Sequence, residues 1–358
     1  MGKKIFCISF SVLFFLSCVI FAAGAFFGGD ASSSEGRELA AFPAWTKEDG
    51  SFNSAFFTEF DSWLTDRFTG RSQFISVNAW IRENIFHSGS DQVLVGRDGF
   101  LFFADTVPDY TGEGLLSEEK IAAAADALLA MSEYAAEKGA KLIVAVAPNK
   151  NTVYGDYMPT AYPRSTEDSN MTRLHEALEE RGVLYTDLRE VLTESETLLY
   201  HKRDTHWNGM GALFAYDAIL DAAEIPHEDY AGYPVVTTQD FPGDLDEMLY
   251  PAKTLYDENT VPDADFENRF IYTSAYRTAM DMIITTRGHG EGKALIFRDS
   301  FGSALIPYFS ASFAEVQYER AVPYRIDLLE TFPADLVVVE IAERNIKNLL
   351  SAADRLTD

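Results

Sequence analysis

From residue 141 onward, short apolar runs alternate with stretches whose apolar residues recur at helical spacing. Uninterrupted apolar runs of this length are typical of strands in a parallel sheet that is buried on both faces. The predicted strands cover 142–147, 183–187, 293–297 and 336–340, and the predicted helices cover about 166–181, 209–224 and a last segment from Glu343. This order predicts an α/β fold, a three-layer α/β/α domain with a mostly parallel sheet.

The chain before this alternation has a different pattern. Apolar residues at helical spacing over 52–86 fit two amphipathic helices, and the runs 93–95 and 100–103 flank a Gly-Arg-Asp-Gly turn signal that predicts a hairpin. Ser117 and two following glutamates predict the start of an Ala-rich helix that ends at Gly139. We expect an N-terminal helical and hairpin segment over 30–115, packed on a main domain over 116–358.

Residues 226–270 interrupt the strand-helix alternation. They hold five of the thirteen prolines of the chain and many acidic residues, without a helical or strand period. We therefore predict an irregular insertion, or cap, at about 226–280 of the main domain.

The first 29 residues resemble neither region. Lys3 and Lys4 precede an uncharged apolar run over 5–27 that is long enough to cross a bilayer as a helix. Small residues at 23–25 suit a signal peptidase, so both a cleaved signal peptide and a retained membrane anchor fit. The two lysines place the N-terminus in the cytoplasm, and we expect residues 30–358 to be extracytoplasmic, at the cell surface, in the periplasm or secreted.

Charge and cysteine content narrow the classes of function. The chain has 29 basic and 56 acidic residues, a net charge of −27. This charge repels nucleic acid, and no basic cluster offsets it, so no nucleic-acid partner is expected. Cys7 and Cys18 both lie in the apolar N-terminal run, so cysteine nucleophiles, cysteine metal sites and disulfides are excluded from the remainder.

Binding sites in open α/β sheets form beyond the carboxyl ends of the parallel strands. Four polar stretches follow predicted strands or precede a helix: Asn149 with Lys150, residues 298–302, Glu340 with Arg344, and residues 201–208. Asn149 and Lys150 either belong to a site or end a strand. Glu340 and Arg344 stand one helical turn apart and are predicted to form an ion pair rather than a substrate clamp.

The stretch 201–208 carries half of a nucleophile-activating relay. Asp204 and His206 are two residues apart, so in an extended segment the carboxylate can hold the imidazole and stabilise its charged form. Ser300, at a predicted strand-to-helix turn, is the candidate nucleophile, and the N–H groups of Phe301 and Gly302 are candidate oxyanion donors.

Simpler interpretations exist for each feature. A serine before a helix is commonly an N-cap, and a zinc site could use His201, Asp204 and His206. We favour the relay because both halves fall at sheet edges expected to converge, and because only His206 of the six histidines lies in such a cluster. No metal and no cofactor is predicted.

Several short motifs occur in an order that points to a family. They are the stretches 63–68 (WLTDRF), 96–102 (GRDGFLF), 148–150 (PNK), 204–207 (DTHW) and 298–301 (RDSF). With these motifs over about 42–350, the chain resembles the DHHW proteins and the alginate O-acetyltransferases AlgJ and AlgX.

The resemblance implies an SGNH-hydrolase-like domain in which an Asp204, His206, Ser300 triad takes an acetyl group onto serine. It further implies transfer of that acetyl group to a polysaccharide hydroxyl, with a membrane-bound O-acyltransferase supplying acetyl from the cytoplasm. In the usual SGNH pattern a glycine precedes Asp-Ser, whereas this chain has Arg298. Asn149 is the candidate for the asparagine of the oxyanion hole, and Lys150 and Arg298 are further substrate candidates.

Two other functions remain open at this point. A carbohydrate acetylesterase would use the same residues with water in place of the acceptor. A non-catalytic surface protein could bind glycan through aromatic side chains, of which the chain has 17 Tyr, 27 Phe and 4 Trp.

Overall fold

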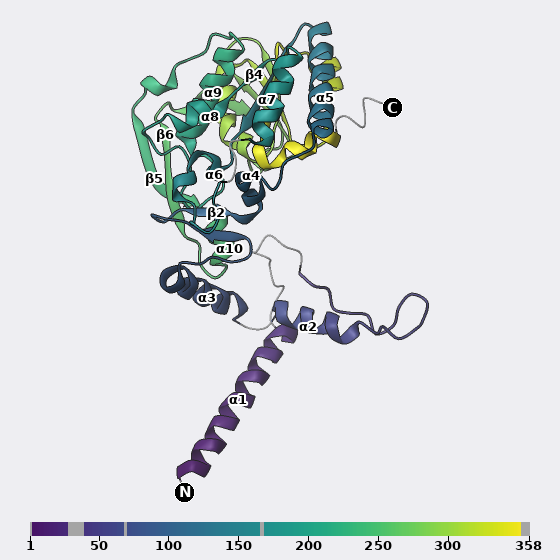
Figure 1. Cartoon of the computed structure of the whole chain (residues 1–358), viewed down its shortest axis with the longest axis vertical. Coiled ribbons are helices and arrows are strands. Elements are labelled where there is room, and N and C mark those ends of the chain that lie inside the picture. The colour runs from purple at the N-terminus through teal and green to yellow at the C-terminus, as the bar shows by residue number, and fades with distance from the viewer. Residues whose placement is uncertain (1, 28–38, 68–69, 165–167, 352–358) are drawn as a thin grey trace. The chain divides into compact units, whose positions relative to one another are not determined.

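The computed structural model describes residues 2–27, 39–67, 70–164 and 168–351, which divide into two compact units (Figure 1). The smaller unit comprises residues up to 93 together with 244–255, and the larger comprises 94–243 and the residues from 256 onward. In this division the hairpin after residue 93 belongs with the larger unit.

Helices make up the smaller unit. They are α1 (Gly2–Phe27), α2 (Phe56–Arg67), α3 (Arg71–Phe86) and α10 (Asp244–Leu249). The two helices predicted over 52–86 are α2 and α3. Within the described residues, no helix combines the length and the apolar character needed to cross a membrane.

Helix α3 is contacted on its polar face rather than on its apolar face. The segment after α10 packs on α3 through a hydrogen bond from the Tyr250 hydroxyl to Glu83 and one from the Ala252 N–H to the Ser76 hydroxyl. The predicted apolar stripe is left in solvent, with Phe74 55% and Ile85 58% exposed. The spacing therefore predicts the helix correctly but not the side that is covered.

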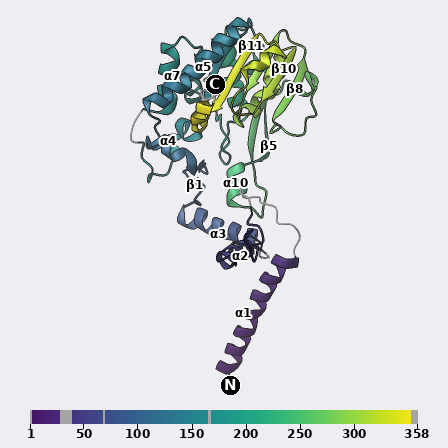
Figure 2. The ribbon, with the colours of Figure 1, turned by 90° about the vertical axis from the view of Figure 1, so that its right-hand side faces the viewer.

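A seven-stranded sheet organises the larger unit, in the order β4-β3-β11-β9-β10-β8-β7 (Figure 2). Its strands are β3 (Lys141–Ala147), β4 (Tyr185–Thr186), β7 (Phe270–Tyr272), β8 (Ile283–Gly288), β9 (Lys293–Phe297), β10 (Glu315–Glu319) and β11 (Leu336–Ala342). The first five strands in the order are parallel, whereas β8 runs antiparallel to β10 and to β7. This confirms the predicted α/β class with a mostly parallel sheet.

Helices cover both faces of the sheet. The main ones are α5 (Glu118–Glu137), α7 (Asn170–Glu180), α8 (Leu188–Thr193), α9 (Gly209–Ala222) and α11 (Ile306–Ser312). Alternate residues of β3 enter two separate cores: Leu142 and Val144 join residues of α5 and α7, while Ile143 and Ala145 join residues of α8, α9 and α11. Figure 1 shows α5 and α7 side by side on one face. The three predicted layers follow from this two-sided burial.

Shorter elements connect these layers. The predicted hairpin is formed by β1 (Val93–Val95) and β2 (Leu101–Phe103). The short helices are α4 (Val107–Thr111), α6 (Lys150–Val153), and the 3-10 helices η1 (Ala104–Thr106), η2 (Gly155–Tyr157), η3 (Tyr230–Gly232), η4 (Phe266–Asn268), η5 (Phe301–Leu305), η6 (Ile326–Glu330) and η7 (Glu343–Leu349). The last helix, predicted from Glu343, is thus a 3-10 helix.

The segment predicted as an irregular insertion has regular structure. Its strands β5 (Val235–Pro242) and β6 (Tyr256–Pro262) pair antiparallel, and β7 extends the main sheet. The prediction is wrong because the prolines stand at the ends of β5 and β6, where they do not interrupt pairing, and β-branched residues fill the strand between them.

Candidate active site

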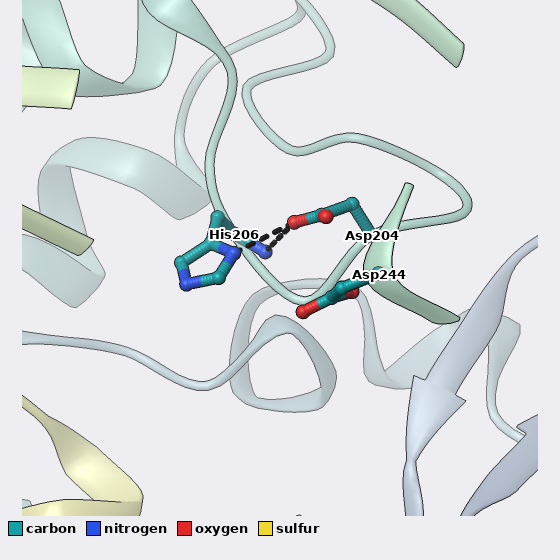
Figure 3. Close-up of side chains that lie close together, drawn as sticks. All are labelled: Asp204, His206 and Asp244. Atoms are coloured by element: carbon teal, nitrogen blue, oxygen red, sulfur yellow. Dashed lines mark hydrogen bonds and ion pairs between the residues drawn. The ribbon is translucent and has the colours of Figure 1, made fainter. Parts of the chain in front are cut away.

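The loop before α9 brings Asp204 and His206 together. Oδ1 of the buried Asp204 lies 2.7 Å from Nδ1 of His206 and also accepts the His206 backbone N–H at 2.8 Å (Figure 3). On the other side of the ring, Nε2 lies 2.8 Å from Oγ of Ser300. The structure therefore brings the three predicted relay residues into one chain of contacts. Asp244, also drawn in Figure 3, belongs to α10 of the smaller unit.

This geometry selects one arrangement of protons. A carboxylate beside Nδ1 favours the tautomer that carries its proton there, which leaves the Nε2 lone pair directed at the Ser300 hydroxyl. His206 can then accept the serine proton while Asp204 stabilises the resulting imidazolium. Chemically, the arrangement can activate a serine as a nucleophile.

Lys150 holds the loop that carries Asp204 and His206 through hydrogen bonds to its backbone. Its buried ammonium group donates to the carbonyl oxygens of His201, Lys202 and Asp204 at 3.2, 3.0 and 2.5 Å. The same group lies 5.5 Å from the centre of the Phe102 ring. Lys150, predicted either to contact substrate or to end a strand, therefore has its donors committed to the loop that carries Asp204.

The β5–β6 pair supports the same loop from another side. The Arg203 N–H donates to a carboxylate oxygen of Asp257 at 2.7 Å, and the His201 ring stacks on Phe241 with ring centres 3.9 Å apart. The segment predicted as a cap thus holds the residues around Asp204 in place.

His201 does not take part in a metal set. Its Nδ1 lies 2.7 Å from the carbonyl oxygen of Glu258, and burial lowers its pKa, which favours the neutral ring. Among the described residues, His201 is not grouped with Asp204 and His206 at distances that a shared ion would need. The zinc alternative is therefore not assembled here.

Ser300 lies between β9 and η5, in the predicted strand-to-helix turn. Its side chain makes no capping hydrogen bond to η5, so the helix-cap interpretation does not apply. The indole N–H of Trp207 donates to the Phe301 carbonyl at 3.0 Å, and the Phe301 ring lies 4.7 Å from the His206 ring. The residues after His206 and Ser300 thus tie the two halves of the relay together.

One of the two predicted oxyanion donors has a partner inside the turn. The Phe301 N–H donates to Oδ1 of Asp299 at 2.9 Å, so a carboxyl group of the turn satisfies the first free N–H group of η5. The role of the Gly302 N–H as an oxyanion donor stays a prediction.

Asp299 and Glu340 fix this turn to β11. Oδ2 of Asp299 accepts the Ala342 N–H at 2.8 Å and the Asn345 side-chain amide at 2.7 Å, while Glu340 accepts the Asp299 N–H at 3.1 Å. Complete burial raises the pKa of Glu340 well above its usual range, which favours the neutral carboxyl. The sequence offers a signal for both residues, an acid that follows an apolar run within two positions.

The predicted ion pair between Glu340 and Arg344 is wrong. Glu340 is a buried residue of β11, and within the described part of the chain no ion pair joins it to Arg344. The expectation assumed a helix across these positions, whereas the strand continues to Ala342.

Arg298 and Asn149 are also committed within the protein. The buried Arg298 guanidinium donates to the carbonyls of Ala279 and Asp281 at 2.8 and 3.1 Å, and burial lowers its pKa to about 10. The Asn149 side-chain amide donates to Asp109 at 3.3 Å. The hydrogen bonds of both side chains in this structure thus go to residues of the protein itself.

Comparison with known proteins gives the relay a context. Residues 93–269 match a family model described as the SGNH hydrolase-like domain of the acetyltransferase AlgX. This part of the chain is therefore similar to the SGNH hydrolase-like domain of AlgX. Asp204 and His206 lie within the matched residues, and Ser300 lies beyond them.

Individual relatives of this SGNH hydrolase-like domain agree. The chain is 26% identical over 152 residues to the probable alginate O-acetylase AlgJ of Pseudomonas putida, an alignment that covers 41% of this chain and 38% of that relative. A DHHW family protein from Eubacterium siraeum superposes with a TM-score of 0.56 at 18% identity, covering 74% of this chain and 96% of the other. PatB1 of Bacillus cereus superposes with a TM-score of 0.55 at 18% identity, covering 71% and 96%. These matches confirm the predicted SGNH-like fold.

Proposed function

We propose that this protein is an extracytoplasmic O-acetyltransferase that places acetyl groups on a cell-surface or exported polysaccharide. The observation that carries the proposal is the His206 ring, with Asp204 at 2.7 Å on one nitrogen and Ser300 at 2.8 Å on the other. The acetyl chemistry and the polysaccharide acceptor are supported by the AlgX-type domain and by the name of the AlgJ relative, an alginate O-acetylase.

The proposed reaction has two halves. Ser300 Oγ attacks the acetyl carbonyl of the donor while Nε2 of His206 takes the serine proton and delivers it to the leaving group. An acetyl-serine results. A polysaccharide hydroxyl then attacks this ester, its proton passes to Nε2 and from there to Ser300 Oγ, and the acetylated polysaccharide leaves. Asp204 holds the ring and balances its positive charge in both halves.

The location and the acetyl supplier belong to the same proposal. The apolar run over 5–27 after Lys3 and Lys4 supports export through a signal peptide or membrane anchor, with a membrane-bound O-acyltransferase delivering acetyl from the cytoplasm. Protease added to intact spheroplasts should digest residues 30–358. Protection that lasts until the membrane is lysed would show that the orientation is wrong.

The decisive test follows the acetyl group. The protein is given a chromogenic acetyl ester with and without an oligosaccharide, and mass spectrometry detects acetyl on the sugar. We expect transfer, and we expect Ser300→Ala and His206→Ala each to lower turnover by about 10⁴-fold or more, with the double variant little worse. Ester hydrolysis without transfer would identify an acetylesterase, and full activity of Ser300→Ala would overturn the relay.

A further inference from the structure

Helix α3 exposes an apolar side. Phe74, Val77, Ile81 and Ile85 are three or four residues apart, so they form one stripe along the helix. Five large apolar side chains of α3 lie more than half in solvent, and three of them are aromatic: Phe74, Val77, Trp80, Ile85 and Phe86. An exposed apolar surface of this kind marks a place where a protein meets a partner or a membrane.

The contacts of α3 within its own unit are made by the opposite side of the helix. Ser76, Ala79 and Glu83 are three and four residues apart and form a second stripe, in which Ala79 is buried. The Ser76 hydroxyl accepts the Ala252 N–H at 3.1 Å. Glu83 accepts a hydrogen bond from the Tyr250 hydroxyl. These contacts hold the helix with its apolar stripe turned outward.

Within α3, which the structure describes over its whole length, the exposed positions hold no charged residue. Besides the apolar side chains, these positions carry only the amides Gln73, Asn78 and Asn84, and the charged residues of the helix are all half-buried. The chain as a whole has a net charge of −27 and is repelled by anionic surfaces. The exposed side of α3 therefore suits a partner surface without net charge.

The same compact unit contains α1, a second exposed apolar element. Phe6, Ile8 and Phe10 of α1 are each more than half exposed. Eleven residues, 28–38, join α1 to the next described segment, and a chain of this length spans at most about 40 Å when fully extended. A bilayer that takes up the apolar side chains of α1 therefore keeps the unit that carries α3 near its surface, at a high effective concentration.

We infer that the apolar side of α3 docks on the surface of a zwitterionic phospholipid bilayer, with the helix axis parallel to the plane of the bilayer. Phenylalanine and tryptophan, the residue types of Phe74, Trp80 and Phe86, favour the boundary between headgroups and acyl chains. Docking gives the protein a membrane contact besides its N-terminal apolar run. The inference does not depend on the proposed function, since acetyl transfer at Ser300 does not enter it.

The test compares an environment-sensitive fluorophore at two positions of the full-length protein. Cys7 and Cys18 are first replaced by alanine, and a nitrobenzoxadiazole label is then attached at Ile85→Cys or at the matched control Ile271→Cys. Ile271 lies on β7 of the larger unit and is 61% exposed, against 58% for Ile85. Both labelled proteins are reconstituted into phosphatidylcholine vesicles with and without brominated lipid, and circular dichroism checks their folding.

We expect the Ile85 label to emit at shorter wavelength in vesicles and to be quenched by brominated lipid, because it enters the acyl boundary. The Ile271 label should show neither effect. In the Ile85-labelled protein, Val77→Ser combined with Trp80→Ser should lower the ratio of docked to free α3 by about 10- to 100-fold, since two side chains lose part of their burial in the bilayer. Asn78→Ser, at an exposed polar position of the same helix, should change that ratio by less than about threefold.

Three outcomes would overturn the inference. They are an Ile85 label that vesicles leave unchanged, equal shifts of the Ile85 and Ile271 labels, and an Ile85 label that is already shifted without lipid. In the last case protein rather than lipid covers the stripe, and a shift that grows with protein concentration would identify a second copy of the chain. If the doubly substituted helix does not fold, the comparison of the two labels still decides, because it leaves Val77 and Trp80 in place.

Discussion

Two polar clusters at the carboxyl edge of the sheet use the same kinds of residue for different purposes. The relay cluster is Asp204, His206 and Ser300, which are linked to one another by contacts from side chain to side chain, with the imidazole still partly exposed. The support cluster is Lys150, Asp299, Glu340 and Glu343, all but Asp299 buried, whose hydrogen bonds run mostly to backbone groups of the turns.

The relay cluster is arranged for proton transfer, whereas the support cluster holds the turns in position. A buried side chain bonded mostly to backbone N–H or C=O groups holds a turn in place. A histidine that lies between a hydroxyl and a carboxylate can accept a proton from the hydroxyl and return it, while the carboxylate stabilises the charged ring. We therefore expect changes in the relay cluster to remove activity with little loss of stability, and changes in the support cluster to affect both.

The largest effect is expected for Asp204→Asn. The amide would favour the wrong imidazole tautomer, so kcat for acetyl-ester hydrolysis should fall by about 10³- to 10⁴-fold, while the midpoint of urea unfolding shifts little. A variant that unfolds readily yet keeps its kcat would place Asp204 in the support cluster instead.

A smaller effect is expected for Lys150→Met, which removes the donor to three loop carbonyls. The free energy of unfolding should fall by about 1.5–3 kcal/mol, as for hydrogen bonds to a charged group, and kcat by about 10- to 100-fold because Asp204 moves.

Lys202→Met is the matched control for Lys150→Met. Lys202 carries its ammonium near the surface, 3.4 Å from the Asp98 carbonyl, so its loss should change stability by less than about 0.5 kcal/mol. If both variants behave alike in urea unfolding and in kcat, Lys150 does not belong to the support cluster.

The last expected effect is a change of stability with pH, which depends on Glu340. Its pKa is raised in the folded protein by burial, so its contribution to stability is complete below the ordinary glutamate pKa of about 4.3 and is lost as pH rises through the raised value. Glu340→Gln does not titrate, so its stability relative to wild type should increase from pH 4 to pH 8, by on the order of 1 kcal/mol for every tenfold rise in proton affinity that burial causes. Denaturant unfolding at both pH values measures this, and a relative stability that falls with pH would contradict the assignment.

Spacing alone predicted much of the larger unit. The run 293–297 coincides with β9, and 142–147 and 336–340 fall within β3 and β11, because a strand buried on both faces must be apolar at every position. Asp204 and His206 were evident as a pair because residues two apart in an extended segment project to one side. Such patterns depend only on residues close together in the sequence, so they can be recognised without knowledge of the tertiary structure.

The tertiary structure alone decided which groups remain available for chemistry. The strands β8 and β10 carry polar residues that apolar runs do not reveal, and the apolar stripe of α3 became its uncovered side. The N–H group of Phe301 is taken by a carboxyl group, while Arg344 forms no ion pair with any of the described residues. Hydrogen bonds and ion pairs join residues far apart in the chain, so a sequence determines which groups exist and only the packed fold determines which of them are already satisfied.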